Sequence, residues 1–182
     1  MERTEKKFAG VKDGEVFKAG GIEFIKFPDR DGVTPVVAKD ILFDSRFGKN
    51  NNFANSDILK RLQKEVLPKV LEDVGEENVL PFRTNLTTLD GLKTYGELES
   101  RISLPTLDFY RENVDVFDRH NPEKWWWLAT ADSAEPHYDP VWITCVSPRG
   151  DIRFDVGRCS LDYYGVRPFL NFVSSIFGSC EE

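Results

Sequence analysis

The stretch that decides the fold is Trp125-Trp126-Trp127-Leu128-Ala129-Thr130. In an extended segment successive side chains point to opposite faces, so Trp125 and Trp127 share one side and Trp126 takes the other. A strand with large apolar side chains on both faces is expected to lie between two layers of structure. We therefore predict that the final third of the chain is assembled around this strand, with the three tryptophans in structural roles.

The segments that follow the tryptophans are typical of strands and turns. A hairpin is predicted from Trp142–Val146 and Ile152–Val156, because the turn Ser147-Pro148-Arg149-Gly150 between them carries proline and glycine at favoured positions. Gly165 is then expected to lead into a closing strand over residues 166–172.

Arg167 lies inside this closing strand, directly before Pro168. Its neighbours are apolar, so we expect the guanidinium to be partly buried and to need a carboxylate or backbone carbonyls. Asp132 and Asp155 are the candidate partners. A structural clamp, with Pro168 beside it, is favoured over contact with a ligand.

The first half of the chain predicts a small β-meander followed by a helix. Within residues 22–27, Ile22 and Phe24 alternate with Glu23 and Lys26, which indicates a half-buried strand with the charged pair outside. A strand is expected over Glu15–Phe17, one further strand from Val36–Ala38 toward Ile41–Phe43, and short strands between Val79 and Leu92.

Apolar residues recur at three- and four-residue spacing from Ile58 to Val74, which predicts the longest helix. Asn55 or Ser56 is expected to cap it and Gly75 to end it, and Pro68 predicts a kink or break near Leu67. A short second helix is predicted after Leu104-Pro105, with Thr106 as its cap.

The order of these elements predicts an α+β fold with mixed and antiparallel sheets, one long helix that proline kinks or breaks, and one short helix. No segment is long or polar enough to divide the chain, so we predict a single domain over residues 1–182. Residues 1–12 and 178–182 are expected to be flexible tails.

The chain has 31 acidic and 24 basic residues and a net charge of −7. This balance argues against a protein that binds a nucleic-acid backbone directly, since such proteins usually carry a basic face. Met1–Lys7 has no apolar core for a secretion signal, and no apolar run suffices for a membrane span. A cytoplasmic protein with reduced Cys145, Cys159 and Cys180 is expected.

Catalysis finds little support in the sequence. The chain has two histidines, His120 and His137, both in polar loops, and none of the common catalytic or phosphate-binding motifs. His137 lies near Asp132, Glu135 and Asp139, a group that could touch a cation, although loop carboxylates are more often simply solvated. No cofactor is expected. Arg149-Gly150-Asp151 matches a cell-adhesion tripeptide, but the hairpin turn already explains its glycine.

The loops Ala131–Pro140 and Arg158–Tyr164 combine polar side chains with amphipathic aromatic rings. Adaptable loops on a rigid β scaffold are typical of a binding surface. The alternative interpretation, that the aromatic rings cover the edges of the core, stays open. The predicted partner-binding residues are Asp132, Glu135, His137, Tyr138, Asp139, Trp142, Arg158, Tyr163 and Tyr164.

Several separated motifs resemble a domain family found in gut bacteria, their phages and other mobile elements. Its members carry a WWL strand, a variable strand-turn-strand region and a closing GVRP motif; here these are Trp125–Thr130, the Ser147–Asp151 turn and Gly165–Leu170. The likeness extends over residues 14–177. Members often show WWLRSP, whereas this chain has Ala129-Thr130-Ala131, so any role of that arginine does not carry over.

The end region of that family is similar to C-type-lectin-like folds, which implies a scaffold that displays loops to a partner. Glu135-Pro136-His137 only partly matches the calcium-binding Glu-Pro-Asn motif of lectins, so no bound calcium is expected. The resulting hypothesis is a non-enzymatic protein-binding module, encoded by a phage or mobile element, that presents loops 131–164. A virion-associated location is the alternative to the cytoplasm of a bacterial host.

Two other functions stay open. One is an inhibitor of a host defence protein such as an RNA-guided nuclease, in which carboxylates occupy a basic groove meant for nucleic acid. The other is a hydrolase that uses loop carboxylates and His137, which ranks last. No direct contact with nucleic acid or a membrane is expected, and the sequence leaves the oligomeric state open.

Overall fold

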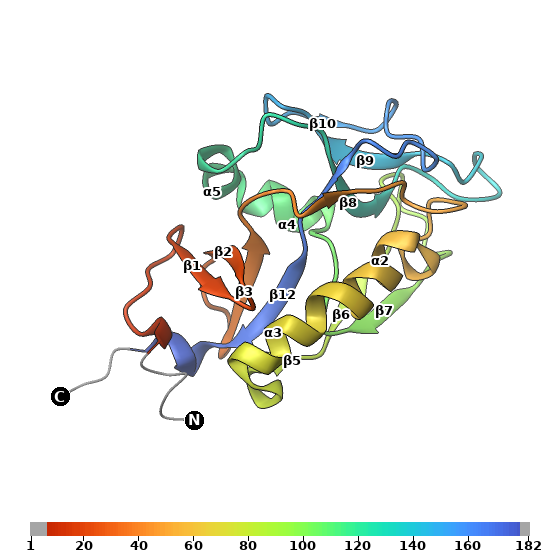
Figure 1. Ribbon diagram of the computed structural model, residues 1–182. Helices are drawn as coiled ribbons and strands as arrows, with labels where there is room; N and C mark the ends of the chain where they lie inside the picture. Colours follow the sequence, from red (N-terminus) through yellow and green to blue (C-terminus); the bar gives the residue numbers. More distant parts are fainter. Residues whose placement is uncertain (1–6, 179–182) are drawn as a thin grey trace.

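The structure is a computed structural model that describes residues 7–178 (Figure 1), and it is a mixed α+β fold with several antiparallel sheets. Sheet A contains, in spatial order, β1 (Val16–Ala19), β2 (Ile22–Lys26), β3 (Val33–Ala38), β12 (Phe169–Val173) and β5 (Val79–Leu80). Sheet B contains β10 (Ile152–Arg153), β9 (Ile143–Val146), β8 (Trp126–Ala131), β11 (Gly165–Val166) and β4 (Phe43–Asp44). A separate hairpin consists of β6 (Phe82–Asn85) and β7 (Glu97–Ser100).

Neighbouring strands run antiparallel except for β8 and β11, which are parallel. Strand β8 is irregular: Trp127 pairs with Cys145 and Ala131 with Ile143, so β8 has two more residues than β9 between these pairs. Such a bulge bends a strand and changes the direction of its end. It lies directly before the loop that was predicted to bind a partner.

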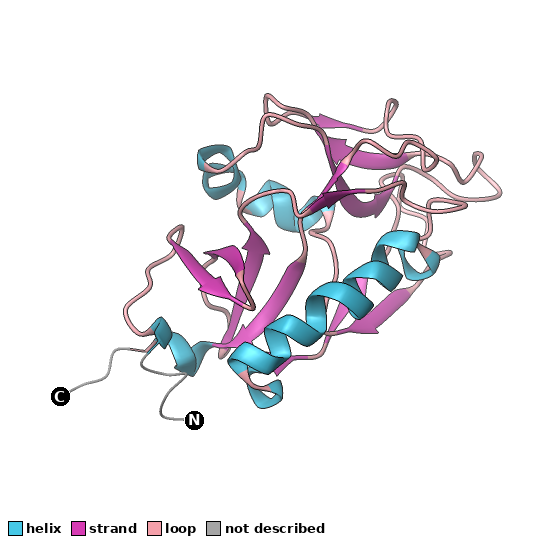
Figure 2. Cartoon of the chain, in the orientation of Figure 1, coloured by secondary structure: helices cyan, strands magenta, loops and turns pink. Residues whose placement is uncertain are grey.

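The longest helix forms where the apolar spacing predicted it (Figure 2). It spans 18 residues as α2 (Asp57–Arg61), a π-helical turn (Leu62–Val66) and α3 (Leu67–Val74). Ser56 caps its start by accepting a hydrogen bond from the Leu59 amide at 3.0 Å, and Gly75 ends it with a φ of 94°. Because Pro68 has no N–H for the helical ladder, the expected break near Leu67 takes the form of the π-helical turn.

The described residues contain five further short helices or 3₁₀ turns, which were only partly predicted. Thr106 caps α4 (Leu107–Glu112), as expected, through a 3.2 Å hydrogen bond from the Phe109 amide. The sequence did not predict α5 (Val114–Arg119), which follows after one residue. The 3₁₀ turns cover Phe53–Asn55, Glu76–Asn78 and Ser174–Phe177.

The two large sheets share two cores, one on each side. The long helix covers one side, where Ile58 and Leu62 pack with Phe24 of sheet A and Trp127 of sheet B. On the other side, α4 and α5 cover a smaller core that includes Trp126. Figure 1 shows the chain passing from sheet B down into β12 of sheet A, between these helices.

The tryptophan strand lies between the long helix on one side and α4 and α5 on the other, which confirms its predicted place between two layers. Trp126 and Trp127 are both fully buried, in different cores, while Trp125 is partly buried on the same side as Trp127. The Trp126 indole donates to Asn121 Oδ1 at 3.0 Å and the Trp127 indole to Ser45 O at 2.8 Å. Their polar atoms are therefore satisfied inside the core.

The predicted closing strand over residues 166–172 is wrong in one respect, because it is two strands in different sheets. β11 pairs with β8 and β4, whereas β12 pairs with β3 and β5. The break falls at Arg167 and Pro168, both buried, where the chain crosses from one sheet to the other. Proline cannot donate a hydrogen bond to a strand ladder, so the crossing lies where one ladder ends.

Arg167 does not contact Asp132 or Asp155, so that expectation is wrong. Its guanidinium lies over the Trp126 ring, 4.6 Å from the centroid, and Nε donates to Ala38 O at 2.9 Å. Its two terminal nitrogens have no hydrogen-bond partner among the described residues, and burial lowers its pKa to about 10. Of the two expected kinds of partner, a carboxylate or backbone carbonyls, the structure thus bears out the carbonyl, together with an aromatic face.

Two further expectations are corrected. Lys26 was placed outside the sheet but is 5% exposed, and its ammonium lies 2.6 Å from Asp13 and 3.1 Å from Asp29. Phe8 belongs to the core, so residues 7–12 are not simply a tail. The remaining tail residues, 1–6 and 179–182, and with them Cys180, lie outside the described residues.

Candidate binding site on the loop face

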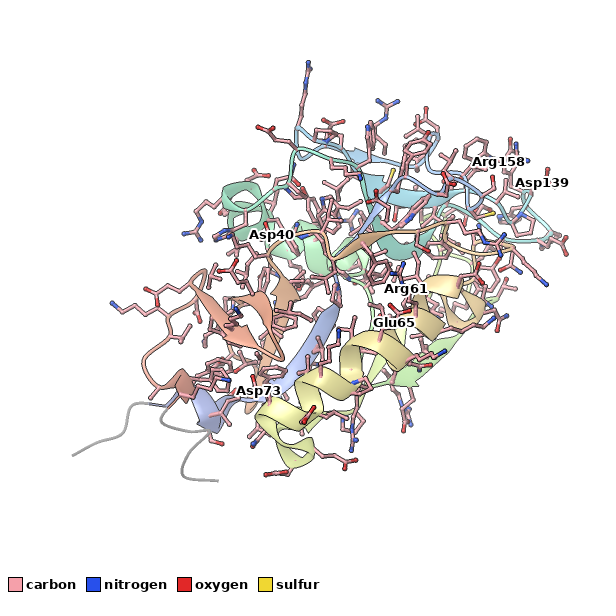
Figure 3. All side chains as sticks on the ribbon, viewed as in Figure 1. Asp40, Arg61, Glu65, Asp73, Asp139 and Arg158 are labelled. Atoms are coloured by element: carbon pink, nitrogen blue, oxygen red, sulfur yellow. The ribbon has the colours of Figure 1, made fainter. Side chains whose placement is uncertain are left out.

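The loops after β8 and before β11 lie together at the end of the molecule away from the two termini. Figure 3 shows Asp139 and Arg158 close to each other at this end. The backbones of Trp142 and Arg158 form an isolated antiparallel bridge, and the Cys159 amide donates to Val141 O at 2.7 Å. The structure therefore brings the two predicted loops into one surface, which we call the loop face (residues 131–164).

A buried amide from a distant segment holds the first loop. Asn51 is fully buried, and its Nδ2 donates to Ser133 O at 2.8 Å and to Trp142 O at 3.0 Å. Its Oδ1 accepts from the Tyr95 hydroxyl at 2.6 Å. One side chain therefore bonds both ends of the loop and holds them together. We call this Asn51 side chain the strut.

Asp90 is a second anchor of the same loop. Its carboxylate accepts hydrogen bonds from Thr88, from Ser133 Oγ at 2.7 Å and from His137 Nδ1 at 3.1 Å. These bonds, that from Thr88 first, hold the pKa of Asp90 at about 2. His137, predicted to face a partner, is exposed but is thus also tied to the scaffold.

This arrangement differs from a hydrolytic triad. In a triad the serine donates to the histidine, which in turn donates to the carboxylate. Here Ser133 and His137 both lie within hydrogen-bonding distance of Asp90 Oδ2, so the serine bonds to the carboxylate instead. Across residues 7–178, no group of three histidine, cysteine or acidic side chains could hold a metal ion.

Two cysteines and the Arg149-Gly150-Asp151 turn have structural roles. Cys145 and Cys159 are buried and form no disulfide, and burial raises the pKa of Cys145 to about 12. Asp151 accepts from the Ser147 hydroxyl at 2.7 Å, and Gly150 O accepts from the Tyr110 hydroxyl at 2.6 Å. These contacts hold the turn in the hairpin.

A hollow of about 290 Å³ opens on the loop face, and we call it the Asp132 cup. It combines carboxylates with aromatic rings, and its lining residues are Asp132, Tyr138, Trp142, Phe154 and Asp155. Tyr138 and Phe154 are 58% and 49% exposed. Three of the predicted partner-binding residues therefore meet in one hollow.

Several polar groups of the cup have no partner within the part of the chain that the structure describes. No residue donates a hydrogen bond to the Asp132 carboxylate, and neither the Tyr138 hydroxyl nor the Trp142 indole N–H is bonded. Burial, and then the charges of Asp90 and Asp155, raise the pKa of Asp132. The cup is thus a half-buried acidic site without a counter-charge on Asp132.

The other predicted site residues divide into two groups. Glu135, Asp139, Arg158 and Tyr163 are exposed on the loop face, as expected, with Tyr163 at 55%. Tyr164 is 3% exposed and stacks on Trp125 and Trp127, so its assignment to a binding surface is wrong. For Tyr164 the alternative interpretation, an aromatic ring that covers the core, is correct.

Phe154, Asp155, Asn51 and Asp90 were missed as members of the site. Phe154 and Asp155 were assigned to a strand over 152–156, but β10 ends at Arg153 and leaves the Phe154 ring in solvent. Phe154, a large apolar residue next to the Asp155 carboxylate after the turn, was the sequence signal that could have indicated this part of the site. Nothing local marks Asn51 or Asp90, because the partners of their side chains lie 43 or more residues away, apart from Thr88 beside Asp90.

A second hollow of similar volume lies between β6, β12 and α4. Its walls include Phe82, Phe109 and Phe169, whose rings pack edge to face. Its charged groups are Arg83, Asp108 and Glu112, and each forms an ion pair with another residue of this chain. This hollow therefore lacks the unpaired charge that distinguishes the Asp132 cup.

Searches of protein-family models, of curated proteins and of solved structures each returned no match to this chain. Among the helices described, none has the length and apolar character needed to cross a membrane.

Proposed function

We propose that this chain is a non-enzymatic protein-binding module, built on a C-type-lectin-like scaffold, that presents the loop face to a protein partner. The observation that carries the proposal is the Asp132 cup, in which the Asp132 carboxylate, the Tyr138 hydroxyl and the Trp142 indole N–H are unbonded within residues 7–178 although the loop around them is firmly anchored. A preorganised binding site needs a backbone held by hydrogen bonds and polar side chains that are free to bond a partner. The resemblance to the WWL…GVRP family supports an origin in a phage or mobile element.

The composition of the loop face supports a protein as the partner. Tyr138, Phe154 and Tyr163 are among the few large hydrophobic side chains that are exposed in residues 7–178. Aromatic residues of this kind are enriched at the centres of protein interfaces, because they bury much area at a low entropic cost. Tyr138 and Phe154 line the cup with Asp132, and Asp139 follows Tyr138 in the chain; these acids supply charge for specificity.

The test is site-specific photo-crosslinking in an extract of bacterial cells. A photoreactive phenylalanine derivative replaces Tyr163 in one variant and Glu72, on the exposed side of the long helix, in the control. A discrete adduct is expected only from position 163, and it should disappear when Tyr138→Ser is added. No adduct from position 163, or identical adducts from both positions, would overturn the proposal.

A second candidate is an inhibitor of a host nuclease that handles DNA, acting in the bacterial cytoplasm. A virion-associated location, with a receptor-binding role, is the alternative to the cytoplasm. Residues 131–164 contain six carboxylates and three arginines, a surplus that suits a basic groove. In this case nuclease activity is blocked, and the block weakens as salt rises. Inhibition that survives charge reversal at Asp132, Glu135 and Asp139 would contradict this mode.

A further inference from the structure

The Asp132 cup has the chemistry of a site for one cation. Two carboxylates, Asp132 and Asp155, share a hollow with the rings of Tyr138, Trp142 and Phe154. Aromatic faces attract cations through their quadrupole, and carboxylates add charge-assisted hydrogen bonds. An anion would meet like charge here, and a neutral apolar group would leave Asp132 buried without a partner.

The carboxylates of the cup are available to such a cation. Asp132 takes part in no ion pair among residues 7–178, and burial with two neighbouring acids already penalises its charge. Asp155 pairs with Arg153 through Oδ1 at 3.3 Å, on the surface, and its Oδ2 forms no bond within the same range. A bound cation would offset the repulsion between these two acids.

Arginine fits this cup better than lysine. Its guanidinium is planar, stacks on aromatic rings, carries five donors and is less strongly hydrated than an ammonium, so it loses less on entering a half-dry hollow. Two arginines of residues 7–178 make this contact: Arg167 lies over Trp126 at 4.6 Å and Arg61 over Phe43 at 3.7 Å. The volume of about 290 Å³ suits a single side chain.

We infer that the Asp132 cup receives an arginine side chain of the protein partner, with the guanidinium between the aromatic rings and its N–H groups donating to Asp132 and Asp155. This inference rests on the proposed function and names the chemistry of the partner at one point. The strut from Asn51 and the anchor at Asp90 keep the cup open without a ligand, so binding needs no reordering of its base.

The test follows the indole N–H signals of the four tryptophans by NMR on the full chain. The probe is the peptide acetyl-Gly-Arg-Gly-amide at millimolar concentration. Its matched control carries citrulline, which has nearly the same shape and no charge. We expect a saturable shift of the Trp142 signal, with the buried Trp126 signal unchanged, and at least tenfold weaker binding of the citrulline peptide.

The variant Asp132→Asn keeps the size of the side chain and removes its charge. It should weaken binding of the arginine peptide at least tenfold and leave the Trp126 and Trp127 signals in place, which shows that the fold persists. An absent Trp142 shift, equal binding of the citrulline peptide, or unchanged binding to Asp132→Asn would overturn the inference. If crosslinking from position 163 still identifies a partner in that case, the loop face is a binding surface whose cup does not take arginine.

Discussion

Strand β8 and the loop that follows it are neighbours in sequence and opposites in structure. All six residues of Trp126–Ala131 are buried, and even the Thr130 hydroxyl is used, accepting from the Leu107 amide at 2.9 Å. One residue later, Asp132 has a carboxylate without a donor. The loop is anchored as well, because the Asp132 amide donates to Trp142 O and Asn51 bonds the carbonyls of Ser133 and Trp142. The structural side chains and the proposed binding side chains thus adjoin at Ala131 and Asp132.

The largest expected effect tests the strand. Trp126→Ala should lower the free energy of unfolding by about 3–5 kcal/mol, because it empties a fully buried site between α4, α5 and sheet B. Urea denaturation followed by circular dichroism measures the loss. Trp125→Ala is the matched control and should cost clearly less, since Trp125 is only partly buried. Equal losses would mean that Trp125 and Trp126 do not differ in burial as described.

The next effect concerns the buried arginine that crosses between the sheets. Arg167→Ala should destabilise the fold by about 2–4 kcal/mol through the lost packing on Trp126. Arg167→Met keeps most of that volume and removes a charge whose two terminal nitrogens are unbonded, so it should lie within about 1.5 kcal/mol of the wild type. If both variants lose the same amount, the charge itself stabilises the crossing.

The strut under the loop should come next. Asn51→Ala removes the donor to the Ser133 carbonyl and leaves the Trp142 carbonyl with the Asp132 amide alone, which should cost about 2–3 kcal/mol. Tyr95→Phe removes one hydrogen bond to Asn51 and should cost about 1 kcal/mol. Hydrogen exchange of the Asp132 amide, which donates to Trp142 O, should speed up in Asn51→Ala. Unchanged exchange would show that the loop is held without the strut.

Asp132 of the loop face and Asp90, which anchors its first loop, should respond to neutralisation with opposite signs. The pKa of Asp90 is lowered from 3.8 to about 2, so its stabilisation is present above pH 4 and is lost as the pH falls toward 2. Asp90→Asn should therefore destabilise the fold at pH 7, by less than about 1 kcal/mol because the side chain is partly solvated.

Asp132 has a raised pKa, so its folded form binds its proton more readily and stability falls as the pH rises through that pKa. Asp132→Asn should therefore leave stability at pH 7 unchanged or slightly higher. A group that costs stability where it stands is typical of a functional position. Thermal melts of both variants between pH 2 and pH 7 measure the contrast, and a loss of the same sign in both would refute it.

The last comparison includes the smallest expected effect, at Tyr163, and tests the correction at Tyr164. Tyr163→Ser should change the free energy of unfolding by no more than about 0.5 kcal/mol, because the ring is mostly in solvent. Tyr164→Ser should instead cost about 3 kcal/mol, because this ring stacks on Trp125 and Trp127. The two adjacent tyrosines, compared by denaturation, separate the surface from the core. A large loss in Tyr163→Ser would place that ring in the core as well.

The sequence by itself determined the features that depend on near neighbours. The alternation of faces at the tryptophans, the apolar spacing of the long helix, its Ser56 cap and Gly75 end, and the Thr106 cap all follow from contacts within a few residues. Proline at position 68 marked the irregular turn for the same reason. Strand or helix periodicity is a local property, so it can be read without knowing the rest of the fold.

Only the tertiary structure decided which side chains meet. Arg167 lies on Trp126 and not beside an aspartate, because the chain crosses between sheets at that point. Tyr164 is buried while Tyr163 is not, because parallel pairing of β11 with β8 directs one ring onto the tryptophans. The Asp132 cup combines residues from two segments, and Asn51, from a third segment, holds the loop that forms it. Such contacts depend on how distant segments pack, which no local pattern encodes.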